Sequence, residues 1–383
     1  MTRTKMQSFK MIRTLILSGV FITGLLGSTA VNALAAAAGS FALTGSLKTA
    51  RYGHTATLLS SGEVLVTGGL GANGIYAPLA SAEIYNPATG KWTVTGSMSV
   101  GRTSFTATLL PNGEVLVAGG STYAATCFAI AEFYNPSTRR WTVTGSMTQP
   151  RCLHMATLLP SGEVLVAGGV DSLFNSPNTA TTAELYNPST GVWQTTGSLN
   201  VSRATAAALL ENGQVLVAGG YNTFNNIFTY LASAELYKPS TGQWSLTASM
   251  QAPEPSPTTP VLLTNSDVLI ADEGQFYNPG IAAWTSTGPL PNTAGPPIVA
   301  TLLNTGNVLA SGTRCIYSGC GHAPSNYCFL DTFSSNSWSA AGSTIHARLG
   351  HTSTLLPSGK VLVAGGYSTN NFIPINSAEL YTP

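Results

Sequence analysis

The sequence predicts an all-β fold, a seven-bladed β-propeller built from four-stranded blades. The first observation is a phrase, PSGEVLVAGG at 160–169, that occurs seven times along the chain with small changes. The second is a further regular phrase after each copy, with an aromatic residue in one expected strand and, in six of the seven units, a tryptophan at the start of the next. The third is composition, because 40 glycines, 22 prolines and only 8% charged residues suit many short strands joined by tight turns.

Each unit begins with a strand that ends in a Leu-Leu pair. The first leucine of the pair recurs at intervals of 40 to 53 residues, close to the roughly 50 residues at which some propeller blades repeat. These leucines are Leu58, Leu109, Leu158, Leu209, Leu262, Leu302 and Leu355. Seven units therefore predict seven blades.

The remaining strands of a unit follow from residue type. The Val-Leu-Val motif at 164–166 is β-branched and apolar on both faces, as a strand between two neighbouring blades must be, and is too short for a helix. Gly162 supplies the left-handed conformation of the tight hairpin before it. A third strand at 183–186 then leads through a turn with proline and glycine, 187–191, into a fourth strand that starts at Trp193.

The two ends of the propeller are predicted to share one blade. Only six fourth strands begin with tryptophan, and the seventh unit stops after its third strand. The stretch 41–47 (FALTGSL) aligns with 193–199 (WQTTGSL), with Phe41 in the place of the tryptophan. We therefore expect 41–47 to be the fourth strand of the blade formed by 348–383, which removes an open edge from the ring.

Residues 1–35 have the order of a secretory signal peptide. Basic residues come first, an apolar run follows at 15–26, and small residues end at 33–35 (ALA). An uncleaved membrane anchor is the alternative, but this run is shorter than the roughly 20 residues that a spanning helix needs. We expect cleavage after Ala35, a single propeller over 36–383, and a secreted, periplasmic or cell-surface location.

Charge limits the classes of partner. Signal cleavage removes four of the 16 basic residues and none of the 15 acidic ones, so the mature chain carries a net charge of about −3. No basic tract remains, whereas nucleic-acid binding needs clustered lysines and arginines. We expect no nucleic-acid partner, no membrane contact after cleavage, and a monomer.

The repeats resemble the kelch-repeat family, in the secreted bacterial form that is similar to the propeller domain of galactose oxidase. The resemblance covers about residues 41–383 and rests on the Gly-Gly pairs and on the Arg and His of RYGHT (51–55), RCLHM (151–155) and RLGHT (348–352). It also rests on the repeated aromatics Tyr85, Tyr134, Tyr186, Tyr237, Tyr277, Phe333 and Tyr381, and on Trp92, Trp141, Trp193, Trp244, Trp284 and Trp338. The resemblance implies kelch-type blades, but propellers of this family include enzymes, sugar binders and protein-interaction modules.

Two charged residues occur together in five of the seven units. An arginine opens the unit and a glutamate lies in its third strand, whereas units 5 and 6 lack both. A charge that occurs only with its opposite is most simply a partly buried ion pair, so we expect structural pairs rather than a ring of substrate-binding cations. The expected pairs are Arg51 with Glu83, Arg102 with Glu132, Arg151 with Glu184, Arg203 with Glu235, and Arg348 with Glu379.

Three histidines stand four positions before a Leu-Leu pair, near the inner strands and the expected channel mouth: His54, His154 and His351. Three imidazoles could act as metal ligands, but only His351 and His54 fall in adjacent blades. A metal site also needs a fitting ligand set with supporting hydrogen bonds. We expect packed, hydrogen-bonded histidines, no metal and no other cofactor.

The cysteines all follow the signal peptide, in a chain bound for an oxidising compartment. Cys127 and Cys152 should lie on the same face of neighbouring blades, so we expect a disulfide between them, with a cross-link to a tyrosine as the alternative. A local disulfide is also expected in the loop that holds Cys320, with Cys315 and Cys328 as the candidates. Metal binding in that loop is disfavoured because the spacing matches no standard zinc motif.

The resemblance to galactose oxidase implies a test for copper radical oxidases, whose propeller carries a Tyr-Cys cross-link, a second tyrosine and histidines. No Tyr-His pair occurs in this sequence, and we expect no further domain after the propeller to supply the further histidine. Gly-x-Ser-x-Gly elbows, His-Glu-x-x-His motifs, phosphate loops and EF-hands are also missing from the sequence. We therefore assign no catalytic residue.

The loops between the second and third strands differ most among the units and are rich in aromatic and amide residues. Aromatics beside amides can bind a sugar or a polar protein surface, or they can pack on one another to order the loops. The ligand-binding candidates are Tyr123, Phe174, Tyr221, Phe224, Phe228, Tyr230, Tyr367 and Phe372. Unit 5 has almost no such loop, which predicts a notch edged by Asp272 and Glu273.

These observations favour a secreted, non-catalytic propeller that binds an extracellular glycan or protein through its loop-rich face. The alternative is an extracellular oxidase or sugar-modifying enzyme on the same scaffold.

Overall fold

A computed structural model describes residues 39–72, 77–122, 126–172, 178–224, 227–253, 260–271, 274–286, 299–313, 328–334, 337–368 and 373–383. The chain divides into two units, Met1–Ala37 and Ala38–Pro383. In these ranges no helix has the length and apolar character needed to cross a bilayer.

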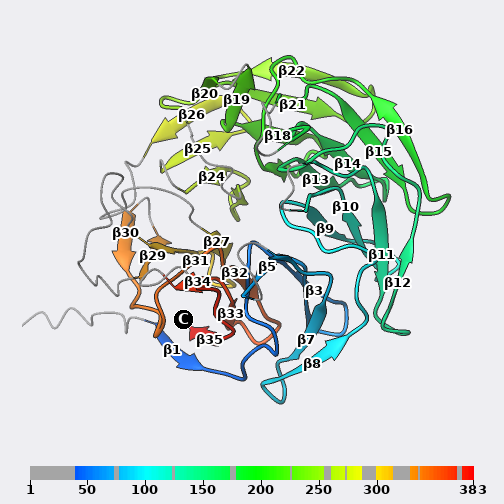
Figure 1. Ribbon diagram of the computed structural model, residues 1–383. Helices are drawn as coiled ribbons and strands as arrows, with labels where there is room; N and C mark the ends of the chain where they lie inside the picture. The colour runs from blue at the N-terminus through cyan, green and yellow to red at the C-terminus, as the bar shows by residue number, and fades with distance from the viewer. Residues whose placement is uncertain are drawn as a thin grey trace, which may run out of the picture. The chain divides into compact units, whose positions relative to one another are not determined.

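Seven four-stranded antiparallel sheets make up the second unit (Figure 1). Blade 1 consists of β3 (Thr55–Leu58), β4 (Val64–Thr67), β7 (Ala82–Asn86) and β8 (Lys91–Thr95). Blade 2 consists of β9 (Thr106–Leu109), β10 (Val115–Ala118), β11 (Ala131–Asn135) and β12 (Arg140–Val143). Blade 3 consists of β13 (Met155–Leu158), β14 (Val164–Ala167), β15 (Ala183–Asn187) and β16 (Val192–Thr196).

The other blades repeat this pattern. Blade 4 consists of β17 (Ala207–Leu209), β18 (Val215–Ala218), β21 (Ala234–Lys238) and β22 (Gln243–Thr247). Blade 5 consists of β23 (Val261–Leu262), β24 (Val268–Ile270), β25 (Gln275–Asn278) and β26 (Ala283–Ser286). Blade 6 consists of β27 (Val299–Leu302), β28 (Val308–Thr313), β29 (Cys328–Ser334) and β30 (Ser337–Ala340). Blade 7 consists of β32 (Thr352–Leu355), β33 (Val361–Ala364), β35 (Ala378–Thr382) and β1 (Ser40–Leu43).

The seven sheets form a closed cycle. Each first strand contacts the first strands of both neighbouring blades, in the order β3, β9, β13, β17, β23, β27, β32 and back to β3. The predicted all-β propeller of four-stranded blades is therefore confirmed.

Seven short strands lie outside the blades. They are β2 (Arg51–Tyr52), β5 (Leu70–Gly71), β6 (Ala77–Pro78), β19 (Tyr221–Phe224), β20 (Ile227–Tyr230), β31 (Arg348–Leu349) and β34 (Tyr367–Ser368). They belong to the segments that lead into a blade and to the connections between its second and third strands. We call the surface that these two kinds of segment build together the loop face.

The N-terminal strand closes the last blade, as predicted. β1 pairs antiparallel with β35, and Phe41 lies opposite Tyr381 with their ring centroids 5.0 Å apart. The strand itself ends at Leu43, and residues 44–47 lead onward to blade 1. There Leu47 is buried in the core between blades 7 and 1.

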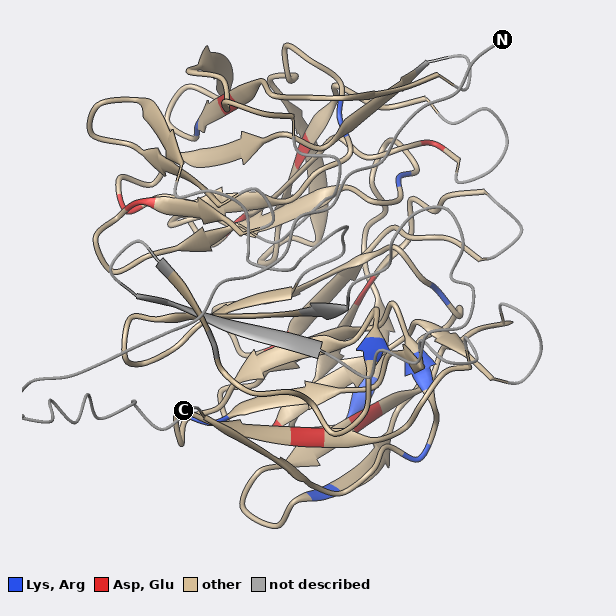
Figure 2. Cartoon of the chain, turned by 90° about the vertical axis from the view of Figure 1, so that its left-hand side faces the viewer, with Lys and Arg blue, Asp and Glu red and all other residues tan. Residues whose placement is uncertain are grey.

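The core lies between neighbouring blades. Every residue of the Val-Leu-Val strands β4, β10, β14, β18 and β33 is buried, because each such strand has a blade on both sides. The repeated tyrosine and tryptophan also join blades: the Tyr85 hydroxyl lies 2.8 Å from Thr44 Oγ1, and Trp92 Nε1 donates to the carbonyl of Gly45 at 2.6 Å. Charged side chains are sparse along the described chain (Figure 2).

Candidate functional site

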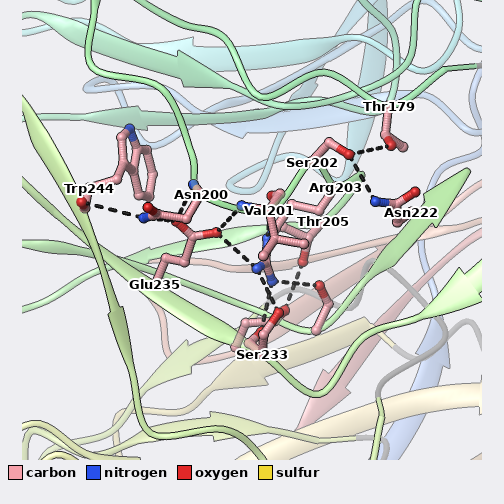
Figure 3. A network of polar contacts seen from close by, with 12 residues as sticks. Thr179, Asn200, Val201, Ser202, Arg203, Thr205, Asn222, Ser233, Glu235 and Trp244 are labelled. Atoms are coloured by element: carbon pink, nitrogen blue, oxygen red, sulfur yellow. Dashed lines mark hydrogen bonds and ion pairs between the residues drawn. The ribbon is translucent and has the colours of Figure 1, made fainter.

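The predicted ion pairs sit at the base of the loop face. The structure brings each of the five arginines against its expected glutamate, and the exposed fraction of all ten side chains is 1% or less. Figure 3 shows the pair of blade 4, in which Arg203 Nη2 lies 3.0 Å from Glu235 Oε1. Burial lowers the pKa of Arg203, and the charge of Glu235 opposes that shift.

Each pair ties a blade to the segment that leads into it. Arg203 also donates to the carbonyls of Gly219 (3.1 Å) and Ser233 (2.8 Å). The carboxylate of Glu235 accepts the backbone N–H groups of Asn200 (2.7 Å) and Val201 (2.9 Å). These groups are fully engaged inside the fold, so they hold the loop face in place and are not presented to a ligand.

Blade 5 is tied to the segment that leads into it without a charged residue. Gln275 occupies the position of the glutamate, with 1% of its surface exposed. Its Oε1 accepts the N–H of Gln251 at 2.7 Å, and its Nε2 donates to the carbonyl of Ala252 at 3.2 Å. A neutral amide can make these contacts without a cationic partner, which explains why this unit has no arginine.

The three histidines lie between blades, with 5 to 6% of their surfaces exposed. Each Nε2 lies within hydrogen-bonding distance of a hydroxyl of the preceding blade: His54 with Thr352 (3.1 Å), His154 with Thr106 (3.0 Å), and His351 with Ser311 (2.8 Å). Burial, together with the nearby arginine, lowers the pKa of His154 and of His351 to about 3. All three are therefore neutral structural links at physiological pH.

A disulfide joins Cys127 of blade 2 to Cys152 at the start of blade 3. Both cysteines are buried in a small apolar cluster with Val170 and Ala204, against which Tyr221 packs. This cluster underlies the loop face where blades 2, 3 and 4 meet.

Isolated β-bridges order the loops above this cluster. Within blade 3, Cys152 pairs with Val170, which pairs with Thr179, and within blade 4 Ala204 pairs with Tyr221. The bridge between Thr126 and Ser172 connects the loops of blades 2 and 3. Thr179 also donates its N–H to the carbonyl of Thr223 at 3.4 Å, which links blade 3 to blade 4. The loop face therefore behaves as a continuous hydrogen-bonded layer in this region.

That layer ends in the hairpin of β19 and β20, which projects from blade 4 (Figure 1). β19 is held from behind by polar contacts: Asn222 Nδ2 donates to Ser202 Oγ at 2.9 Å, and Thr179 Oγ1 donates to the same oxygen at 3.0 Å (Figure 3). β20 is exposed along its whole length. Its apolar side chains Ile227, Phe228 and Tyr230 are 68%, 56% and 55% exposed.

Some of the predicted loop aromatics pack against other residues of the loop face, and others are exposed to solvent. Tyr221 packs inward, with its ring centroid 5.6 Å from that of Phe228, and Tyr367 packs on Tyr52 at 5.1 Å. Phe228 and Tyr230 face outward. The backbones at Tyr123, Phe174, Phe372, Cys315, Cys320, Asp272 and Glu273, and the side chains of Phe224 and Cys328, lie outside the described residues.

The sequence reasoning did not identify Ile227 or the polar contacts that support the hairpin. The sequence signal for Ile227 is its place beside Phe228 and Tyr230 in a loop without charged residues.

In the described ranges, no three His, Cys, Asp or Glu side chains gather closely enough to hold a metal ion.

Comparison with known proteins agrees with this description. Residues 50–99 and 202–251 match the Kelch motif. These two segments include blades 1 and 4 of the β-propeller. Kelch-like protein 23 of Mus musculus is 27% identical over 201 residues, which are 52% of this chain and 33% of that protein, and the Homo sapiens protein gives the same values. The chain spans about a third of the length of these curated relatives.

Two solved structures share the fold. A fungal alcohol oxidase of the AA5 family, in complex with copper, superposes with a TM-score of 0.65 at 16% identity, over 90% of this chain and 76% of its own. YjhT superposes with a TM-score of 0.53 at 13% identity, over 87% of this chain and 95% of its own. At these identities the likeness concerns the fold alone.

Proposed function

We propose that this chain is an exported, non-catalytic binding module that holds a protein ligand on the loop face of blades 3 and 4. The observation that carries the proposal is the hairpin of β19 and β20, an exposed apolar strand on a rigid base. Exposed apolar side chains that gather in one place mark interaction sites more often than single ones do.

The base of the hairpin supports a binding role. A binding surface must keep its shape without ligand, because ordering it on binding would subtract from the affinity. Here Tyr221 rests on the cluster around the Cys127–Cys152 disulfide, and Asn222 is held by Ser202. The exposed strand β20 is therefore presented by parts of the fold that are already ordered.

Side-chain chemistry favours a protein over a glycan. A glycan site would use aromatic rings beside hydrogen-bonding groups, whereas β20 exposes the rings of Phe228 and Tyr230 on one face and the aliphatic Ile227 on the other. No charged residue occurs from 219 to 234. Uncharged aromatic and aliphatic side chains are typical of the central part of protein interfaces.

The test compares ligand classes on one surface. Purified protein is screened against a random peptide display library and a glycan array, alongside the double variant Phe228→Ala, Tyr230→Ala. Val94→Ala is the matched control, because Val94 is also an exposed apolar residue (57%) but lies on β8 of blade 1. We expect peptide binders that are lost in the double variant and kept in the control. Glycan binding that depends on the same two rings, or peptide binding that ignores them, would contradict the proposal.

The fold similarity to the fungal alcohol oxidase supports a second candidate, an extracellular oxidase. The described residues do not fit a copper site of that kind, because the three buried histidines lie in different blade interfaces and each already contacts a hydroxyl. Stoichiometric copper in the purified protein, with peroxide release from alcohols or sugars, would establish this candidate in place of the first.

A further inference from the structure

We propose that β20 binds its protein ligand by strand addition, so that an extended, uncharged peptide segment joins the free edge of the hairpin. This inference rests on the proposed function and specifies its partner and geometry. It starts from the direction of the backbone groups of β20.

The hairpin register determines which backbone groups face outward. Tyr221 lies opposite Tyr230, Asn222 opposite Thr229, and Thr223 opposite Phe228. In an antiparallel pair, opposed residues alternate between those that exchange two hydrogen bonds and those that exchange none. One known pair therefore fixes the whole ladder.

Tyr221 supplies that information. Its N–H and carbonyl exchange hydrogen bonds with Ala204 on the far side of β19, at 3.2 and 2.9 Å. They therefore point away from β20, and the pair of Tyr221 with Tyr230 is not hydrogen-bonded. The bond from the N–H of Leu231 to the carbonyl of Gly220, at 2.9 Å, confirms the alternation one step along.

The same alternation applies to Phe228. Thr223 directs its backbone toward Thr179, so the pair of Thr223 with Phe228 is also not hydrogen-bonded. The N–H and carbonyl groups of Phe228 and Tyr230 consequently face away from β19. They have no protein hydrogen-bond partner among the described contacts.

With respect to the described residues, β20 is therefore a free edge with two outward donor–acceptor pairs, two residues apart. An added antiparallel strand can satisfy both pairs, which is the geometry of β-strand addition. A sugar ring offers no such repeat of donors and acceptors.

The side chains define the partner further. Native sheets protect exposed edges with lysine, proline or bulges. The outer blade strands β8 and β12 begin with Lys91 and Arg140, but the hairpin has no charge or proline. Ile227 projects from one face of β20, and Phe228 and Tyr230 from the other. The partner segment should thus alternate apolar side chains on both faces and carry no charge where it pairs.

The decisive experiment separates backbone pairing from ring contact. Peptides enriched on the full chain are synthesised, and their affinity is measured for Phe228→Ala and Phe228→Pro. Alanine keeps the outward N–H, whereas proline removes it without breaking a bond inside the hairpin. We expect Phe228→Pro to bind about tenfold more weakly than Phe228→Ala, the factor for one lost interaction of about 1.4 kcal/mol.

The peptide provides an independent arm. Two N-methylated peptides are compared, one modified at its odd-numbered residues and one at its even-numbered residues. One modification should abolish binding and the other should leave it unchanged, because the N–H groups of only one set face β20. Unchanged melting temperatures show that the variants are folded, and Tyr230→Pro repeats the test if Phe228→Pro is not. Equal affinities for the alanine and proline variants, with no effect of N-methylation, would overturn strand addition while leaving a ring-dependent binding module. Binding of glycans with no peptide binding would overturn both strand addition and the proposed function. Self-association through β20 would overturn a peptide partner and assign the edge to a second copy of this chain.

Discussion

Arg203 Nη2 lies 3.0 Å from Glu235 Oε1, in a site where neither side chain reaches solvent. A buried ion pair of this kind is strongly destabilised when one partner is removed, because an unpaired charge remains in the interior. In blade 5 the glutamine Gln275 makes the backbone contact of the glutamate without any arginine.

These two blades predict a double-variant result. Arg203→Met should lower the free energy of unfolding by about 3 to 5 kcal/mol, because Glu235 is left buried and uncompensated. Adding Glu235→Gln should recover a substantial part of that loss, since the amide can still accept the N–H of Asn200. Chemical denaturation of the single and double variants measures both values. A double variant no more stable than Arg203→Met would show that the charge was not the cause.

The buried histidines predict acid sensitivity. His154 and His351 have a pKa of about 3 in the fold, against an ordinary value of 6.5. Between these values the unfolded chain binds protons that the folded chain does not, so stability falls as the pH falls. Each histidine contributes a slope of about 1.4 kcal/mol per pH unit well below pH 6.5.

Denaturation of wild type and His154→Gln from pH 8 to pH 5 measures this effect. Glutamine can keep the hydrogen bond to Thr106 but does not titrate, so the variant should show a shallower slope below pH 6 and the wild-type slope above pH 7. Parallel curves across the whole range would contradict the burial of a neutral imidazole at this position.

The link between blades 7 and 1 predicts opposite outcomes for two nearby leucines. Leu47 is 1% exposed in the core between these blades, whereas Leu43, on the same N-terminal segment, is 58% exposed. Leu47→Ala should therefore lower the free energy of unfolding by about 2 to 5 kcal/mol. Leu43→Ala should change it by less than about 0.5 kcal/mol. Similar losses for both variants would mean that the segment acts only through strand pairing.

The disulfide predicts a link between redox state and the hairpin. Cys127 and Cys152 are 25 residues apart, and closing a loop of this length stabilises a fold by about 3 to 4 kcal/mol in the chain-entropy model. Replacing both with serine should lower the melting temperature and raise amide exchange in β19, because Tyr221 packs against the disulfide cluster. Hydrogen exchange followed by mass spectrometry measures amide exchange in β19, and β13 of blade 3 serves as the reference segment. Unchanged amide exchange in β19 would show that the disulfide does not stabilise the hairpin.

The sequence predicted the blade more completely than the surface. The Val-Leu-Val strands, the ion pairs and the N-terminal closure were accessible because burial restricts residue type at those positions and the repeats sample each position several times. Among the described residues, this connection forms a hairpin of four paired residues in blade 4 and a pair of only two residues in blade 1, so the repeats gave little to compare. Tyr221 and Phe228 look alike in sequence and share one face of the hairpin, and only the tertiary structure shows that the first packs on the disulfide cluster while the second is exposed.

The most direct test of the free edge is residue-resolved amide exchange by NMR in the region 227–231. In the free protein, the amides of Phe228 and Tyr230 should exchange rapidly and that of Thr229 slowly, because only Thr229 pairs with Asn222 across the hairpin. In complex with an enriched peptide, Phe228 and Tyr230 should become protected. Protection of these two amides already in the free protein, or rapid exchange that persists in the complex, would contradict strand addition at β20.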